Sequence, residues 1–183
     1  FKYGWCFGFG YFLFSLYWIA ISLTFDQSFR FLIPIAIILL PAFLAIFYGL
    51  ITYLFSILYS KSLVSSFFIF SILFGIIEFA RGFILTGFPW NLISFSFSDT
   101  IYFIQILSVI GTYSFNLICI SLFIIPALFY LRKSRIEIMV CFFFILISVS
   151  FLIFGSIKND NFNSLMSVKN SYTIKAISSN ISL

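Results

Sequence analysis

Long runs of apolar residues constrain this 183-residue chain more than any other feature. The chain is 63% hydrophobic and only 8% charged, whereas soluble domains carry about 25% charged residues. A helix needs about 20 apolar residues to cross the hydrocarbon core of a bilayer, and several runs reach that length. Because that core offers no water to unpaired backbone groups, such runs must become helices. The sequence therefore predicts an all-α polytopic membrane domain with about five transmembrane helices and the lipid bilayer as its solvent.

The predicted organisation divides the chain into three parts. Residues 1–156 form the transmembrane domain, residues 157–171 are polar and are interpreted as a linker, and residues 172–183 alternate between apolar and polar side chains, which is typical of a strand. The strand would begin a water-soluble domain. Because the chain starts without Met and ends within this alternating pattern, we expect a fragment of a longer protein. The predicted spans are Cys6–Thr24, Phe31–Ser60 with bends allowed at Pro34 and Pro41, Leu63–Phe79, the later part of Ile101–Leu131, and Ile136–Phe154.

The segment from Arg81 to Thr100 interrupts the apolar pattern with Gly82, Gly87, Pro89 and Asn91. Proline lacks a backbone N–H and disfavours helical geometry at the residue before it. We interpret this segment as a re-entrant or interfacial loop that does not cross the membrane.

The basic residues indicate an orientation, because Lys and Arg are enriched in cytoplasmic loops. Five spans place one group on the side where the chain starts, namely Lys2, Lys61, Arg132, Lys133 and Arg135, and a smaller group opposite, namely Arg30, Arg81 and Lys158. We therefore expect the chain to start in the cytoplasm, with the 81–100 loop and everything after Phe154 on the outer face. The net charge of +5 is spread without a basic stripe, so no nucleic-acid partner is expected.

The residue inventory limits the available chemistry. The chain has no histidine, which removes histidine-based proton relays, Ser-His and Cys-His nucleophile pairs and most metal sites. Cys6, Cys119 and Cys141 each lie within an apolar run and form no CxxC pair, so they are interpreted as small buried hydrophobic residues. No metal or cofactor is expected.

Two features of the stretch "EFARGFILTGFPWN" stand out. Glu78 and Arg81 are spaced i, i+3, so they can pair on one helix face, and we expect them near the outer interface. The pair either caps a helix end and holds the loop, or presents Arg81 to a lipid phosphate. Gly87 and Pro89 either make a tight turn before an interfacial tryptophan, or break the chain so that Trp90 faces an opening.

The same stretch, "EFARGFILTGFPW", resembles the signature of bacterial apolipoprotein N-acyltransferases, in which a Glu, an Arg-Gly pair and Thr-Gly-Phe-Pro-Trp recur at this spacing. "GFGYFLFSLYWIAISL" and "IQILSVIGTYSFNLI" resemble flanking membrane segments of that family. "IKAISSNIS" resembles the first strand of its nitrilase-like domain, although Ser178 and Ser179 stand where Gln and Gly are usual.

The resemblance implies an acyltransferase of the bacterial inner membrane. Such an enzyme transfers an acyl chain from a phospholipid to the N-terminal amine of a diacylglyceryl-cysteine on a lipoprotein, through a thioester on a catalytic cysteine. The catalytic Glu, Lys and Cys of the family lie in the nitrilase-like domain, on the outer face and beyond the end of this chain. No catalytic residue is therefore assigned here, and the fragment alone is expected to be inactive. The expected substrate or lipid entrance consists of Glu78, Arg81, Gly87, Pro89 and Trp90.

Two other functions remain open on sequence grounds. A polytopic transporter usually shows several intramembrane charges and paired broken helices, whereas this chain has one polar site at a span edge. A structural anchor for an outer-face domain would have no need of the Glu78–Trp90 pattern. A nitrilase-like sequence with Glu, Lys and Cys following this chain would favour the enzyme.

The predicted orientation can be tested by labelling the two ends of the last span. In a background whose native cysteines are alanine, Ser134→Cys and Asn161→Cys should react with a membrane-impermeant thiol reagent from opposite sides of the membrane. Labelling of both positions from one side would contradict the five-span arrangement.

Overall fold

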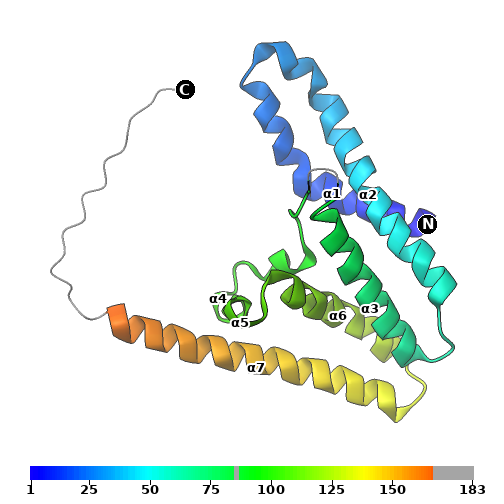
Figure 1. The fold of residues 1–183 in the computed structure, drawn as a ribbon, viewed down its shortest axis with the longest axis vertical. Coiled ribbons are helices and arrows are strands. Elements are labelled where there is room, and N and C mark those ends of the chain that lie inside the picture. Colours follow the sequence, from blue (N-terminus) through cyan, green and yellow to red (C-terminus); the bar gives the residue numbers. More distant parts are fainter. Residues whose placement is uncertain (85–86, 167–183) are drawn as a thin grey trace.

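The structure, a computed structural model, describes residues 1–84 and 87–166, and its regular elements in this part are all helices (Figure 1). The predicted strand within residues 172–183 lies outside the described residues. In chain order the elements are α1 (Lys2–Leu16), η1 (Tyr17–Thr24), η2 (Gln27–Leu32), α2 (Ile33–Leu58), α3 (Leu63–Arg81), η3 (Ile93–Phe97), α4 (Ile101–Ile104), α5 (Leu107–Ile110), α6 (Thr112–Leu131) and α7 (Arg135–Met166).

Five helical segments of the described part are long and apolar enough to cross a membrane, which confirms the predicted number of spans. They are Lys2–Thr24, Gln27–Leu58, Leu63–Arg81, Thr112–Leu131 and Arg135–Leu165. The first changes from α to 3-10 geometry at Tyr17. Between α3 and α6 the described residues form only short helices, so the segment after Arg81 adds no sixth helix of membrane length.

Close packing of α1 against α2 forms an antiparallel hairpin (Figure 1). Gly4 and Gly8 lie one turn apart on α1, and a Cβ atom at Gly8 would come within 2.8 Å of the Tyr48 Cβ and 3.1 Å of the Ala45 Cα. Small residues at such spacing let membrane helices approach closely. The hairpin thereby buries Tyr48 against Phe12, and this contact leads directly to the polar site described below.

A second cluster joins the start of α3 to the turn between α6 and α7. Phe67 of α3 packs with Leu128 of α6 and with Cys141 and Phe144 of α7. The turn between α2 and α3 and the turn between α6 and α7 therefore lie at the same end of the bundle (Figure 1). If five spans alternate in direction, the two turns that carry basic residues must lie on the same side of the membrane, as they do here. That this side is the cytoplasmic one is a prediction.

Helix α7 differs from the sequence-based expectation, because it continues through Met166 into residues interpreted as linker. At 1.5 Å per residue its 32 residues span about 48 Å, well beyond a hydrocarbon core of about 30 Å. The extension packs on the α4 region: Gly155 lies against the Tyr102 backbone, and Lys158 Nζ donates to Ser108 Oγ at 3.3 Å. These contacts hold the helix as far as Lys158, beyond the predicted end of the span at Phe154.

The cysteines follow the predicted pattern at two of three positions. Cys119 and Cys141 are buried, whereas Cys6 is exposed. The prediction for Cys6 was wrong because α1 meets the rest of the described structure through its Gly4, Gly8 and Phe12 face, and Cys6 lies off that face.

Substitution of Gly8 tests the importance of the close α1–α2 approach. Gly8→Leu should lower the apparent melting temperature of the protein in detergent, because overpacking costs about 1–3 kcal/mol. Gly10→Leu is the matched control on the same helix, since nothing lies within 4 Å of a Cβ added there. Equal stability of the two variants would show that the glycine contact is dispensable.

Candidate functional site

Glu78 and Arg81 occupy the last turn of α3 and form the predicted ion pair, with 3.6 Å between Arg81 Nη2 and Glu78 Oε1. Their environment differs from the expected interface. Glu78 is 0% exposed and Arg81 is 1% exposed, because α1, α2, α6 and the following loop enclose them. Buried charges are costly unless paired and hydrogen-bonded, so the partners of this pair define the site.

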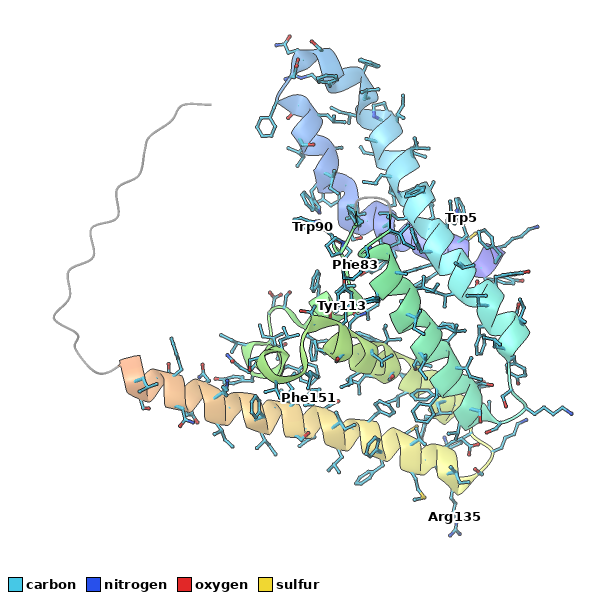
Figure 2. The ribbon with its side chains drawn as sticks, viewed as in Figure 1. Trp5, Phe83, Trp90, Tyr113, Arg135 and Phe151 are labelled. Atoms are coloured by element: carbon cyan, nitrogen blue, oxygen red, sulfur yellow. The ribbon has the colours of Figure 1, made fainter. Side chains whose placement is uncertain are left out.

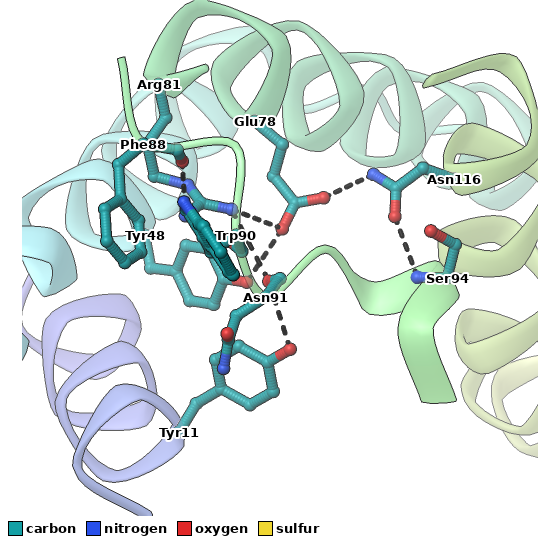
Figure 3. Close-up of polar contacts among 9 residues, drawn as sticks. All are labelled: Tyr11, Tyr48, Glu78, Arg81, Phe88, Trp90, Asn91, Ser94 and Asn116. Atoms are coloured by element: carbon teal, nitrogen blue, oxygen red, sulfur yellow. Dashed lines mark hydrogen bonds and ion pairs between the residues drawn. The ribbon is translucent and has the colours of Figure 1, made fainter. Parts of the chain in front are cut away.

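The Glu78 carboxylate uses both oxygens (Figure 3). Oε1 accepts a hydrogen bond from the Tyr48 hydroxyl of α2 at 2.9 Å, in addition to its contact with Arg81. Oε2 accepts a hydrogen bond from the side-chain amide of Asn116 on α6. The carboxylate thereby links α2, α3 and α6, and it acts as an acceptor in each contact.

The Arg81 guanidinium binds the backbone of the loop that follows α3. Nη1 donates to the carbonyl oxygens of Phe88 at 3.1 Å and Trp90 at 2.9 Å, and Nη2 reaches the Asn91 carbonyl at 3.5 Å (Figure 3). The guanidinium carbon also lies 5.2 Å from the centre of the Phe12 ring. These contacts favour the interpretation in which the pair holds the loop over the one in which Arg81 meets a lipid phosphate.

Two further side chains hold the same loop from other helices. The Tyr11 hydroxyl of α1 donates to the Asn91 carbonyl at 3.2 Å. Asn116 Oδ1 accepts a hydrogen bond from the Ser94 backbone N–H at 2.9 Å. The chain between Phe88 and Ser94 is thus fixed by side chains of α1, α3 and α6, and we call residues 88–94 the anchored loop.

The backbone conformation before the anchored loop explains why glycine occupies position 87. Gly87 has φ +78°, a left-handed conformation that side chains resist, and an added Cβ would collide with the Gly82 carbonyl oxygen. Asn91 also has a positive φ of 56°, which asparagine tolerates better than most residues. Pro89 lies between these two positions, in a stretch without helical structure. The chain therefore leaves helical geometry before Trp90, as both interpretations of Gly87 and Pro89 require.

Trp90 projects from the anchored loop and is 54% exposed (Figure 2). Its ring lies 6.0 Å from that of Trp18 in η1, tilted by 55°. The two tryptophans line a groove of about 510 Å³ together with Ile19, Ile21, Ser22, Phe25 and Phe88. No charged side chain contributes to this lining among the described residues, so the groove suits an apolar ligand.

The fold and this site define a class of protein: a multi-pass helical membrane protein whose buried ion pair holds a loop beside an apolar groove. In the described part of the chain, no group of His, Cys, Asp or Glu side chains could hold a metal ion.

Comparison with known proteins identifies the family. The family model for the apolipoprotein N-acyltransferase N-terminal domain matches residues 1–125, and the chain belongs to this family. Curated proteins named apolipoprotein N-acyltransferase are similar to it: that of Rhizobium rhizogenes is 38% identical over 134 residues, that of Brucella melitensis 39% over 128, and that of Rhizobium etli 40% over 135.

These alignments cover 73%, 69% and 73% of this chain but 25%, 24% and 25% of the relatives. The chain therefore spans about a quarter of the length of these proteins. No solved structure matches it.

Sequence reasoning found Glu78, Arg81, Gly87, Pro89 and Trp90, and the structure brings them together. It missed Tyr11, Tyr48, Asn116 and Trp18. Asn116 carried a usable signal, since it is the one side-chain amide within α6 and polar groups in membrane helices usually have partners. The two tyrosines carried no comparable signal, because Tyr and Phe are abundant throughout the chain.

Removal of the guanidinium tests the importance of the ion pair. Arg81→Met should destabilise the protein by about 3–5 kcal/mol, because Glu78 would remain buried without its counter-charge. The melting temperature in detergent reports this loss. Arg135→Met, which removes an exposed arginine from the other end of the bundle, is the control and should change it little (Figure 2). A comparable effect of both substitutions would rule out a special contribution of the pair.

Proposed function

We propose that the full-length protein is a lipoprotein N-acyltransferase of the bacterial inner membrane. It transfers an acyl chain from a phospholipid to the N-terminal amine of a diacylglyceryl-modified lipoprotein. Family membership and the names of the relatives support this activity. The catalytic Glu, Lys and Cys belong to a nitrilase-like domain beyond this chain, on the outer face of the membrane, and the reaction needs no cofactor.

One observation supports a specific role for the present residues: the anchored loop presents Trp90 beside an apolar groove, while the charges of Glu78 and Arg81 are buried. The charged groups of Arg81 and Glu78 bind each other and other groups of the protein. Apart from Ser22, the surface left at the groove is aromatic and aliphatic. Such a surface accepts an acyl chain without desolvating a charge.

Tryptophan suits the boundary between acyl chain and head group, because it combines a large apolar face with one N–H donor. Trp90 and Trp18 contact each other and both line the groove, so one acyl chain lying in it could pack against both rings. We place the lipid entrance of the enzyme at this groove. Glu78, Arg81, Gly87 and Pro89 contribute by setting the position of Trp90.

The two rival functions make different demands on this site. A transporter needs charges or polar groups that a substrate can reach, whereas Glu78 and Arg81 are buried and bound to the chain itself. A structural anchor needs the helices but not the exposed face of Trp90. The experiment on Trp90 therefore separates the enzyme entrance from the anchor.

Truncation of Trp90 should slow acyl transfer in the full-length enzyme. The indole contributes apolar contact of about 1.5–3 kcal/mol when covered, which corresponds to roughly tenfold to a hundredfold in rate. Trp90→Phe should retain part of the activity, since it keeps an apolar ring and loses the N–H. Acyl transfer to a diacylglyceryl peptide in vesicles containing phosphatidylethanolamine is the measurement.

Phe95→Ala is the matched control. Phe95 is an exposed aromatic residue shortly after Trp90, and it does not line the groove. Its truncation should leave acyl transfer unchanged. A Trp90→Ala enzyme that accumulates normally and works at the parent rate would contradict the entrance and favour a purely structural turn.

A further inference from the structure

We infer that Asn116 of α6 is a positioning residue, which fixes the anchored loop, and with it Trp90, through simultaneous contacts with Glu78 and Ser94. Its Nδ2 donates to Glu78 Oε2, and its Oδ1 accepts from the Ser94 N–H at 2.9 Å. Asn116 is 1% exposed, and both partners are also buried. Its effect on acyl transfer rests on the proposed function, whereas its effect on the loop does not.

The chemistry of this position requires an amide. A carboxylate on one side needs a donor, and a backbone N–H on the other side needs an acceptor. Asparagine supplies both from one planar group, and only one orientation of that group satisfies both partners. Aspartate offers no donor when ionised, and an apolar residue offers neither group. Asn116 therefore links the two groups, so that the position of the Glu78 carboxylate determines the position of the Ser94 backbone N–H.

The contacts around the loop show why this one residue affects Trp90. Arg81 holds the carbonyls on the early side of the anchored loop, including that of Trp90 itself. Asn116 holds the late side at Ser94. Both side chains converge on Glu78, so the two sides of the loop share one buried anchor (Figure 3). Loss of the Asn116 contact releases the loop at Ser94, beyond the Asn91 carbonyl that Tyr11 and Arg81 hold.

A simpler interpretation is that Asn116 only helps α3 pack against α6. The two interpretations differ in the expected effect of substitutions that change the hydrogen-bonding groups and preserve the side-chain shape. The loop should loosen only if the hydrogen bonds of Asn116 hold it. Glu and Gln are nearly isosteric, as are Asn and Asp, so exchange of the two chemical groups preserves packing. In the double variant Glu78→Gln/Asn116→Asp, the amide at position 78 donates to the carboxylate at 116. That carboxylate still accepts from Ser94, and the position-78 carbonyl still accepts from Tyr48 and Arg81.

Hydrogen exchange in the full-length protein, followed by mass spectrometry on peptides covering residues 88–97, provides the test. Asn116→Asp places two carboxylates side by side, and Glu78→Gln places amide donors against each other or against Arg81. Each single variant should speed exchange of the Ser94 region by about tenfold to a hundredfold, because buried polar groups lose partners. Peptides from the middle of α3 and α6 should be unaffected. The double variant should restore exchange to within about threefold of the parent, allowing for the relocated charge.

Asn161→Asp is the control for the change of amide to carboxylate, since Asn161 is exposed on the extension of α7. It should leave the exchange unchanged. If a single variant fails to accumulate, the double variant is compared with the parent, and parent-like accumulation and loop exchange support the inference. A double variant with exchange as fast as the worse single variant, or single variants that loosen α3 and α6 as much as the loop, would overturn it.

Acyl transfer by the same variants separates this inference from the proposed function. The single variants should lower kcat for the diacylglyceryl peptide by about tenfold, and the double variant should recover it, because the reacting chain depends on the position of Trp90. If loop exchange follows the expected pattern while acyl transfer does not change in any variant, the positioning stands and the entrance proposal fails. If loop exchange is not rescued, the positioning fails whatever the activity.

Discussion

The buried Glu78–Arg81 pair is the interaction on which the rest of the site depends. Two charges within a helical membrane bundle are tolerated only if nearly every donor and acceptor finds a partner. The structure meets this demand by bringing Tyr48 and Asn116 to the carboxylate and three loop carbonyls to the guanidinium. The end of α3 therefore becomes the point where α1, α2, α6 and the following loop meet.

Close helix packing makes this meeting possible. Gly8 lets α1 approach the Tyr48 side chain, and the buried Tyr48 ring then stands where its hydroxyl reaches Glu78. From the same helix, Tyr11 reaches the Asn91 carbonyl. The small residues of the α1–α2 hairpin and the polar contacts of α3 thus form one structural unit, although they are far apart in the sequence. Loss of either would displace the other.

The separation of polar and apolar surfaces at this site is the feature on which the proposed lipid entrance depends. The charges of Glu78 and Arg81 are directed into the protein, where they pair with each other and Arg81 fixes the loop backbone. The opposite surface of the loop carries Trp90, whose ring contacts that of Trp18, and both rings line an apolar groove. A rigid backbone next to an apolar groove holds an aromatic side chain in place without presenting a charge to an acyl chain.

The sequence by itself determined the five spans, the i, i+3 pairing of Glu78 with Arg81 and the interruption of the helix at Gly87 and Pro89, because these depend on apolar length, helix periodicity and local backbone chemistry. It did not determine the burial of the pair, the helical extension of α7 or the exposure of Cys6, which depend on what packs against each surface. Only the tertiary structure brought Tyr48, Asn116 and Tyr11 to the site, across 30, 38 and 80 residues of chain to their respective partners. Contacts over such distances arise from helix packing, which local sequence patterns do not encode.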